Sequence, residues 1–238
     1  SMRRAVVQLA AVVPKLQLQQ TKMLHKSVAA AAASPSPFLQ SGGGLAARHY
    51  TPVHEKESVL FVCDLQEKFR KAIPQFGEVC EITRRLVKTA QVLKVPIICT
   101  EQYPEGLGNT VADIELPADT PVINKSTFSM CTPPVMSYMK PEHKSVILVG
   151  IEAHVCCFHT TLALLDRGYA VHVVVDAVTS RSVHDRKYAF AQMERAGAIL
   201  TTSENVIFGL VKGRDHEKFK DILNIIKTRG PETGLSKL

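Results

Sequence analysis

Residues 144–156 read Lys144-Ser145-Val146-Ile147-Leu148-Val149-Gly150-Ile151-Glu152-Ala153-His154-Val155-Cys156, and the architecture expected for the whole chain follows from them. A run of branched apolar side chains that stops at Gly150 indicates a buried parallel strand. Cys156 then lies in the first turn of a helix at the carboxyl edge of the sheet, where α/β proteins build their sites. The free N–H groups and the helix dipole there favour thiolate over thiol. Cys156 is a candidate nucleophile, and an inert core cysteine is the alternative.

Two other apolar runs end on ionisable residues. The run 58–63 is followed by Asp64, and the run 121–124 is followed by Lys125. Because parallel strands point their carboxyl ends the same way, we expect Asp64, Lys125 and Cys156 to converge at one edge of the sheet. Each residue alone has an ordinary explanation, since an Asp at a strand end is often a turn former. Together an acid, an amine and a thiol make a plausible reaction centre.

The rest of the chain alternates strands and helices, which predicts one domain over residues 53–228. We expect a three-layer α/β/α fold with a mostly parallel, Rossmann-like sheet of about six strands. The long loop expected at 101–120 falls near the predicted site. No run is long enough for a membrane helix. Strands are expected at 58–63, 96–100, 121–124, 144–150, 170–175 and 198–201, and helices at 78–94, 132–139, 155–167, 184–196, 203–211 and 216–228.

Five short motifs occur in order over residues 58 to about 210 and carry a family resemblance. They are Asp64-Leu65-Gln66-Glu67-Lys68-Phe69, Thr100-Glu101-Gln102-Tyr103-Pro104, Lys125-Ser126-Thr127-Phe128-Ser129, residues 150–156 and Asp176-Ala177-Val178-Thr179-Ser180-Arg181. With them the chain resembles the isochorismatase-like cysteine hydrolases, and within these the isochorismatase domain-containing proteins of animals and protists.

The resemblance implies a catalytic triad of Asp64, Lys125 and Cys156. The thiol would attack a carbonyl carbon to give a thioester that water hydrolyses, Lys125 would lower the pKa of the thiol, and Asp64 would carry its proton to the leaving amine. The oxyanion would be bound by the backbone N–H groups of Glu152 and Cys156. The family arranges these groups with a cis peptide, expected here between Ile151 and Glu152.

The remaining cysteines compete weakly for the same role. Cys157 lies one residue along the helix, so only one of the two thiols can face Asp64 and Lys125, and the motif selects Cys156. Cys63 precedes Asp64 on a strand, which predicts that it points to the opposite face, into the core. The spacing of Cys80, Cys99 and Cys131 matches no metal site or disulfide framework.

Differences between this sequence and its relatives narrow the range of possible substrates. Isochorismatase itself carries a glycine at the position of Cys156, so isochorismate hydrolysis is not expected. Nicotinamidases place an Asp-x-His metal motif where this chain has no histidine, at 100–106. The sequence therefore predicts no metal and no cofactor. Gln66, Tyr103 and Phe128 lie close after the predicted site strands and could line a slot for a small amide or related C–N acyl substrate.

The first 52 residues are expected to be a leader of mitochondrial type. Residues 1–54 contain six Lys and Arg residues and no Asp or Glu. The whole chain has 29 Lys and Arg, so the remainder has 23 of them against 22 Asp and Glu, and the domain is nearly neutral. This balance argues against a nucleic-acid partner. An Ala-, Ser- and Arg-rich leader without acids favours the mitochondrial matrix, with the cytoplasm as second choice and a secretory signal as another reading of the leader. Residues 229–238 are expected to form a C-terminal tail.

The expected helix 155–167 is apolar all round, which favours burial between layers or in a homo-oligomer. Two functional hypotheses remain. The chain is either a cysteine hydrolase acting on a small molecule, or a catalytically silent relative that binds a metabolite or a protein partner. The complete set of Asp64, Lys125 and Cys156 favours the first.

Overall fold

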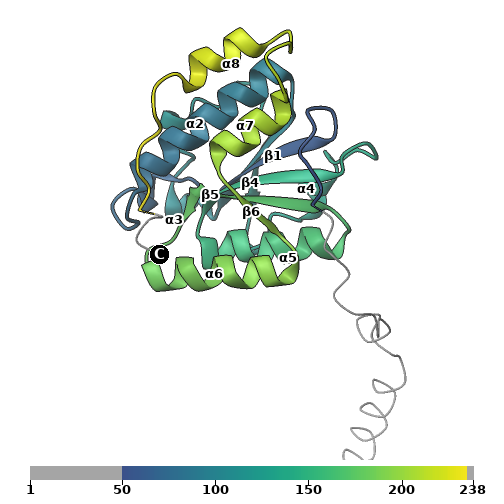
Figure 1. Ribbon diagram of the computed structural model, residues 1–238. Coiled ribbons are helices and arrows are strands. Elements are labelled where there is room, and N and C mark those ends of the chain that lie inside the picture. The colour runs from purple at the N-terminus through teal and green to yellow at the C-terminus, as the bar shows by residue number, and fades with distance from the viewer. Residues whose placement is uncertain (1–49, 235–238) are drawn as a thin grey trace, which may run out of the picture. The chain divides into compact units, whose positions relative to one another are not determined.

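The computed structural model describes residues 50–234. Its centre is one parallel sheet with the strand order β3-β2-β1-β4-β5-β6. The predicted three-layer α/β/α class with six strands is confirmed, and Figure 1 shows helices on both faces of the sheet. The strands are β1 (Ser58–Cys63), β2 (Ile97–Gln102), β3 (Val122–Lys125), β4 (Ser145–Ile151), β5 (Ala170–Thr179) and β6 (Ile199–Thr201).

Most helices lie where the periodicity places them, with corrections at their ends. The expected helix 155–167 divides into a π-helical turn, η4, and the helix α5, while the expected loop 101–120 contains the short helix α3 and the turn η3. The helices are α2 (Phe76–Leu93), α3 (Pro104–Leu107), α4 (Pro133–Met136), α5 (Phe158–Asp166), α6 (Val183–Ala196), α7 (Ser203–Val211) and α8 (Phe219–Ile226), with the turns η2 (Glu67–Phe69), η3 (Ala112–Ile114) and η4 (Ala153–Cys157).

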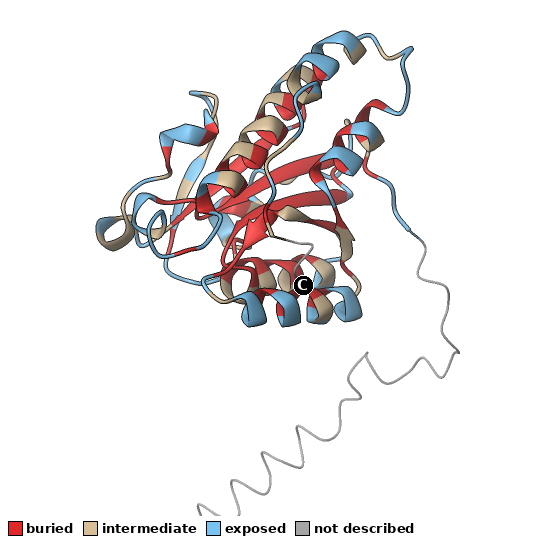
Figure 2. Cartoon of the chain, turned by 60° about the vertical axis from the view of Figure 1, so that its left-hand side comes forward, coloured by how far each residue is buried: buried red, intermediate tan, exposed pale blue. Residues whose placement is uncertain are grey.

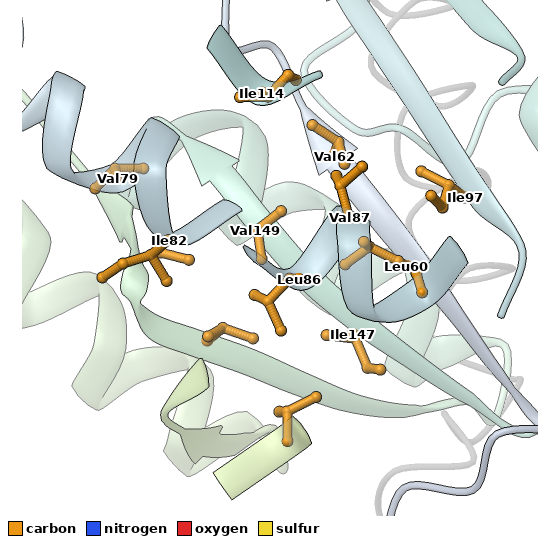
Figure 3. Packing of buried hydrophobic residues seen from close by; sticks show 14 of the residues in the cluster. Leu60, Val62, Val79, Ile82, Leu86, Val87, Ile97, Ile114, Ile147 and Val149 are labelled. Carbon is orange, nitrogen blue, oxygen red and sulfur yellow. The ribbon is translucent and has the colours of Figure 1, made fainter. Parts of the chain in front are cut away.

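The sheet separates two hydrophobic cores. On one face α2, α7 and α8 cover the sheet (Figure 1), because α2 repeats buried residues at helical spacing. Figure 3 shows the contact between α2 and the central strands, and Figure 2 shows that these strands are buried along their length. The residues concerned are Val79, Ile82, Leu86 and Val87 of α2, Leu60 and Val62 of β1, and Ile147 and Val149 of β4.

The second core lies under α5 and α6. Alternate residues of β1, namely Val59, Phe61 and Cys63, face it and pack with Cys156 and Cys157. The same alternation in β4 places Val146 and Leu148 on this side. Helix α6 is capped before its first residue by Ser182, whose hydroxyl accepts from the N–H of Asp185 at 3.3 Å, and after its last residue by Gly197, with a left-handed φ of 118°.

One glycine is required by the close approach of two strands. Gly150 of β4 pairs with Cys63 of β1 and has a φ of 122°. A Cβ at this position would overlap the carbonyl of Cys63. The end of β4 can therefore lie against the end of β1, and this contact brings η4 next to the residue that follows β1.

Candidate active site

The carboxyl ends of β1, β3 and β4 bring the three predicted catalytic side chains together. Asp64 follows β1 in a left-handed conformation with φ 51°, Lys125 ends β3, and Cys156 lies in η4 just after β4. The side chains of Lys125 and Asp64 are 0% and 2% exposed, and Cys156 is 7% exposed. The site is therefore enclosed almost completely by the chain itself.

Asp64 and Lys125 form a buried ion pair. Lys125 Nζ lies 2.7 Å from Asp64 Oδ2, and Thr100 Oγ1 donates to the other carboxylate oxygen at 2.8 Å. The ammonium also donates to Gln102 Oε1 at 2.7 Å and to the carbonyls of Thr127 and Phe128 at 3.2 and 3.0 Å. Burial lowers the pKa of Lys125, but its acidic neighbours, among them the Asp64 carboxylate that accepts its hydrogen bond, outweigh burial and raise the pKa overall. Lys125 is thus a fixed ammonium.

The thiol of Cys156 is the third member, with Sγ 3.6 Å from Lys125 Nζ. The hydrogen bond with Cys63 raises the pKa of Cys156 most; burial and the Asp64 carboxylate add to this, and Lys125 opposes them. The net direction is upward, which corrects the sequence-based expectation of a thiolate favoured by the helix end. The dipole of a helix turn is outweighed by burial and a nearby carboxylate. The surroundings of Cys156 therefore favour the thiol over the thiolate, and a reaction with its sulfur as nucleophile would require a base.

Cys63 lies in the site, which was not expected. Its Sγ, that of Cys156 and a carboxylate oxygen of Asp64 all lie within 4.8 Å of one another. The prediction that Cys63 points away from Asp64 is wrong because strand alternation ends at Asp64, whose left-handed backbone turns its side chain back toward the same face. Burial raises the pKa of Cys63 well above its ordinary value.

The peptide between Ile151 and Glu152 is cis, as predicted. The carboxylate of Glu152 accepts hydrogen bonds from the backbone N–H and the guanidinium of Arg181, at 2.7 to 3.2 Å. Burial would raise the pKa of Glu152, but these bonds lower it overall. The residue that begins η4 is thereby tied to the end of β5. Use of the N–H groups of Glu152 and Cys156 as an oxyanion hole stays a prediction.

The three predicted substrate contacts differ in position. Gln66 is buried, and its side-chain amide is hydrogen-bonded to other parts of the chain. Its Nε2 donates to the carbonyls of Gln102 and Gly108 at 3.0 and 2.6 Å, and its Oε1 accepts from Gln102 N at 2.7 Å. It holds the loop after β2, and offers no free N–H to a ligand. Tyr103 and Phe128 are 61% and 53% exposed, and the Phe128 ring stacks on His159.

Comparison with known proteins shows which family the chain belongs to. The family model described as "Isochorismatase domain" matches residues 58–205, from β1 into α7. The chain belongs to the isochorismatase family. The region matched contains the whole candidate site described above, together with every strand of the sheet.

Curated relatives in the isochorismatase family agree with this placement. The chain is 46% identical over 180 residues to isochorismatase domain-containing protein 1 of Danio rerio, covering 75% of this chain and 64% of that protein. It is 47% identical over 180 residues to isochorismatase domain-containing protein 2 of Homo sapiens, covering 75% and 87%. The match to the zebrafish protein thus spans under two thirds of that protein's length.

Solved structures show the same isochorismatase fold. A structure described as MAR1 ribonuclease from Caenorhabditis elegans matches with a TM-score of 0.76 and 55% identity, covering 78% of this chain and 97% of that one. The octameric hydrolase YcaC of Escherichia coli matches with a TM-score of 0.66 and 20% identity, covering 74% and 91%. The second likeness shows the fold alone.

One group of possible metal ligands occurs within residues 50–234, and it is Cys63, Asp64 and Cys156 of the candidate site itself. The ammonium of Lys125 lies 2.7 Å from the carboxylate and 3.6 Å from the Cys156 sulfur. A fixed positive charge so close to the donor atoms repels a metal cation. This set of residues fits a triad better than a metal centre.

Sequence reasoning missed Thr100 and Gln102 as parts of the candidate site. Thr100 binds Asp64 and Gln102 binds Lys125, both at the end of β2 between β1 and β3. Their motif, 100–104, carried the family resemblance, but no local pattern assigned either side chain a partner. The strand order supplies the signal, because β2 lies between the strands that deliver the acid and the amine.

Proposed function

We propose that the chain is a metal-independent cysteine hydrolase that cleaves the C–N bond of a small amide or related acyl compound through a thioester. One observation carries the proposal: the Lys125 ammonium lies between the Asp64 carboxylate and the Cys156 sulfur, at 2.7 and 3.6 Å. A nucleophile, a base and a fixed cation within reach of one another suit acyl transfer.

The first half of the reaction uses each member of the triad once. Asp64 takes the thiol proton as the sulfur of Cys156 attacks the carbonyl carbon, and Lys125 stabilises the thiolate while it forms. The tetrahedral oxyanion binds to the backbone N–H groups of Glu152 and Cys156. As this intermediate collapses, Asp64 returns the proton to the departing nitrogen, and the acyl group remains on the sulfur.

The second half releases the acid. Asp64, again a carboxylate, takes a proton from the water that attacks the thioester, and it gives that proton to the sulfur as the Cys156 thiol leaves. The raised pKa of Cys156 supports this cycle, because the resting thiol already carries the proton that the leaving nitrogen needs. Lys125 stays protonated throughout, in keeping with its raised pKa.

The enclosure of the triad supports a compact substrate. We propose that the exposed rings of Tyr103 and Phe128 line its approach: Tyr103 N donates to the Lys125 carbonyl at 3.1 Å, and the Phe128 carbonyl accepts from Lys125 Nζ at 3.0 Å. Gln66 serves by holding the loop after β2. This arrangement favours small planar amides, imides and ureido compounds over polymers.

The experiment is a screen of such compounds, with ammonia or amine release as the readout and rapid acid quenching followed by intact mass measurement to detect the acyl adduct. We expect turnover and an adduct on Cys156, both absent in Cys156→Ala and both present in the matched control Cys157→Ala. An adduct on Cys157, or turnover that survives Cys156→Ala, would contradict the mechanism.

A ribonuclease activity, suggested by the description of the C. elegans relative, is a competing outcome of the same screen. The structure offers it little support, since the Lys125 ammonium already has five acceptors and both it and Asp64 are buried. Cleavage of RNA that Cys156→Ala abolishes, without turnover of any amide, would replace the proposal.

We also propose a mitochondrial location and a homo-oligomeric state. The predicted leader 1–52 lies outside the described residues apart from 50–52, and no helix among the residues that the structure describes could span a membrane. Partly exposed apolar residues on η4 and α5 (Val155, Phe158, Leu162 and Leu165) support self-association. Import of a reporter fused to residues 1–52 tests the first point, and light scattering tests the second. A reporter left in the cytoplasm, or a monomeric mass, would refute them.

A further inference from the structure

Cys63 lies beside the proposed nucleophile Cys156 but has no role in the proposed hydrolysis. Their sulfurs lie within 4.8 Å of each other and of an oxygen of Asp64, and Cys63 Sγ is 3.6 Å from Asp64 Oδ2. Cys63 is fully buried and Cys156 is 7% exposed. A second thiol beside a nucleophilic thiol has its own chemistry, because the two sulfurs can be oxidised to a disulfide.

The two sulfurs start near bonding distance. Cys63 ends β1 and pairs with Gly150, which lies six residues before Cys156 and, lacking a side chain, lets β1 and β4 approach closely. A disulfide needs sulfurs about 2.05 Å apart. The two sulfurs lie within 4.8 Å of each other, so rotation of the side chains must shorten the distance between them by less than about 3 Å. Both residues belong to the same core cluster.

We propose that Cys63 and Cys156 form an oxidative modification site, in which hydrogen peroxide or another small hydroperoxide converts the pair into a disulfide. Cys63 acts as the resolving thiol and Cys156 as the thiol that is oxidised first. The modification withdraws the nucleophile and is reversed by a thiol reductant.

The chemistry balances with the groups at the site. Asp64 takes the Cys156 proton, the sulfur attacks one peroxide oxygen, and the O–O bond breaks. The departing oxygen leaves as water with the proton from Asp64, so Cys156 becomes a sulfenic acid. Cys63 sulfur then attacks the Cys156 sulfur, its proton leaves with the hydroxyl as a second water, and the disulfide forms. Two thiols are oxidised and one peroxide is reduced.

Cys156 is the thiol oxidised first because it is more exposed than Cys63 and lies beside the Lys125 ammonium. Lys125 Nζ is 3.6 Å from its sulfur and stabilises the thiolate that attacks the peroxide. Cys63 lies deeper, on the side of Asp64. Cys157 is also buried in this core cluster, and it is the thiol that could substitute for Cys63.

The test treats the reduced full chain with hydrogen peroxide, blocks free thiols with iodoacetamide and digests it with trypsin without reduction. The tryptic peptide 57–68 carries Cys63, and the peptide 145–167 carries Cys156 and Cys157. We expect these two peptides to be linked in the wild type and in Cys157→Ser, and to be unlinked in Cys63→Ser. Because detection is by mass, the outcome does not depend on finding a substrate.

A second measurement follows reversibility. After peroxide and then dithiothreitol, labelling of Cys156 by iodoacetamide should recover in the wild type, while in Cys63→Ser Cys156 proceeds to sulfinic acid and recovery falls at least about fivefold. Cys63→Ala serves if the serine variant fails to fold, with circular dichroism as the check. Equal recovery in wild type and Cys63 variants, a Cys156–Cys157 bond as the main wild-type product, or no oxidation at all would overturn the proposal.

Discussion

Removal of the buried Lys125 ammonium should destabilise the chain strongly, and a double-mutant cycle with Asp64 tests why. In Lys125→Met the Asp64 carboxylate, with its side chain 2% exposed, loses the cation at 2.7 Å. An uncompensated buried charge costs about 3 to 5 kcal/mol. Asp64→Asn should cost less, about 1 to 3 kcal/mol, since the ammonium keeps Gln102 Oε1 and two carbonyls as acceptors.

Urea unfolding at one fixed protein concentration measures the effect. With a slope of about 3 kcal/mol per molar urea, Lys125→Met lowers the midpoint by about 1 to 1.7 M. The double variant, which buries two neutral side chains, should be more stable than the sum of the single losses predicts, by about 2 to 3 kcal/mol. Additive losses within about 0.5 kcal/mol would show that the two charges do not form the buried pair described here.

Three further predictions concern stability. Gly150→Ala should prevent soluble folding, because the added Cβ would overlap the Cys63 carbonyl. The matched variant Gly77→Ala in α2, where no atom lies within 4 Å of the added Cβ, should fold normally. The soluble yields of the two variants are compared, and a soluble Gly150→Ala with a normal melting temperature would refute the close approach of β1 and β4. Burial lowers the pKa of His172 to about 4. As the pH falls, the unfolded chain therefore takes up the His172 proton before the folded chain does, and the free energy of unfolding falls by about 3 kcal/mol between pH 6.5 and 4. In His172→Gln the melting temperature should lose this part of its pH dependence. A pH dependence equal to that of the wild type would contradict the prediction. Thr100→Val removes the hydroxyl that donates to Asp64 and should cost about 1.5 to 3 kcal/mol in urea unfolding, and a loss under about 0.5 kcal/mol would show that this bond is dispensable.

The sheet and the convergence of Asp64, Lys125 and Cys156 could be predicted because their signals are local. The strands β1 and β4 are buried runs of mostly branched apolar residues, and they end close before Asp64 and Cys156. The short strand β3 is partly exposed, but it ends on Lys125. Since all strands are parallel, knowing where they end suffices to place these residues at one edge.

The details of the site could not be predicted because they depend on single backbone conformations and on strand order. Period-two alternation placed Cys63 away from the site, and the left-handed φ of Asp64 breaks that alternation. Gln66 is polar and near the site in sequence, but no sequence pattern shows that the loop at Gly108 occupies its amide. The helix-end argument for a Cys156 thiolate omitted the hydrogen bond with Cys63, burial and the Asp64 charge, which together raise the pKa of Cys156.

The position of β1 in the middle of the sheet has a consequence for the biosynthesis of the protein. β1 is the first strand of the described chain, yet its partner β4 begins 87 residues later, where Ser145 Oγ meets Ser58 Oγ at 2.8 Å. At typical translation speeds β1 waits on the order of 5 to 20 s for that partner. Until then the edge of β1 that pairs with β4 has no partner, and Cys63 lacks the neighbouring thiol of Cys156. The nascent chain is therefore most exposed to aggregation before residue 145, and the candidate site is complete only once β4 has paired with β1.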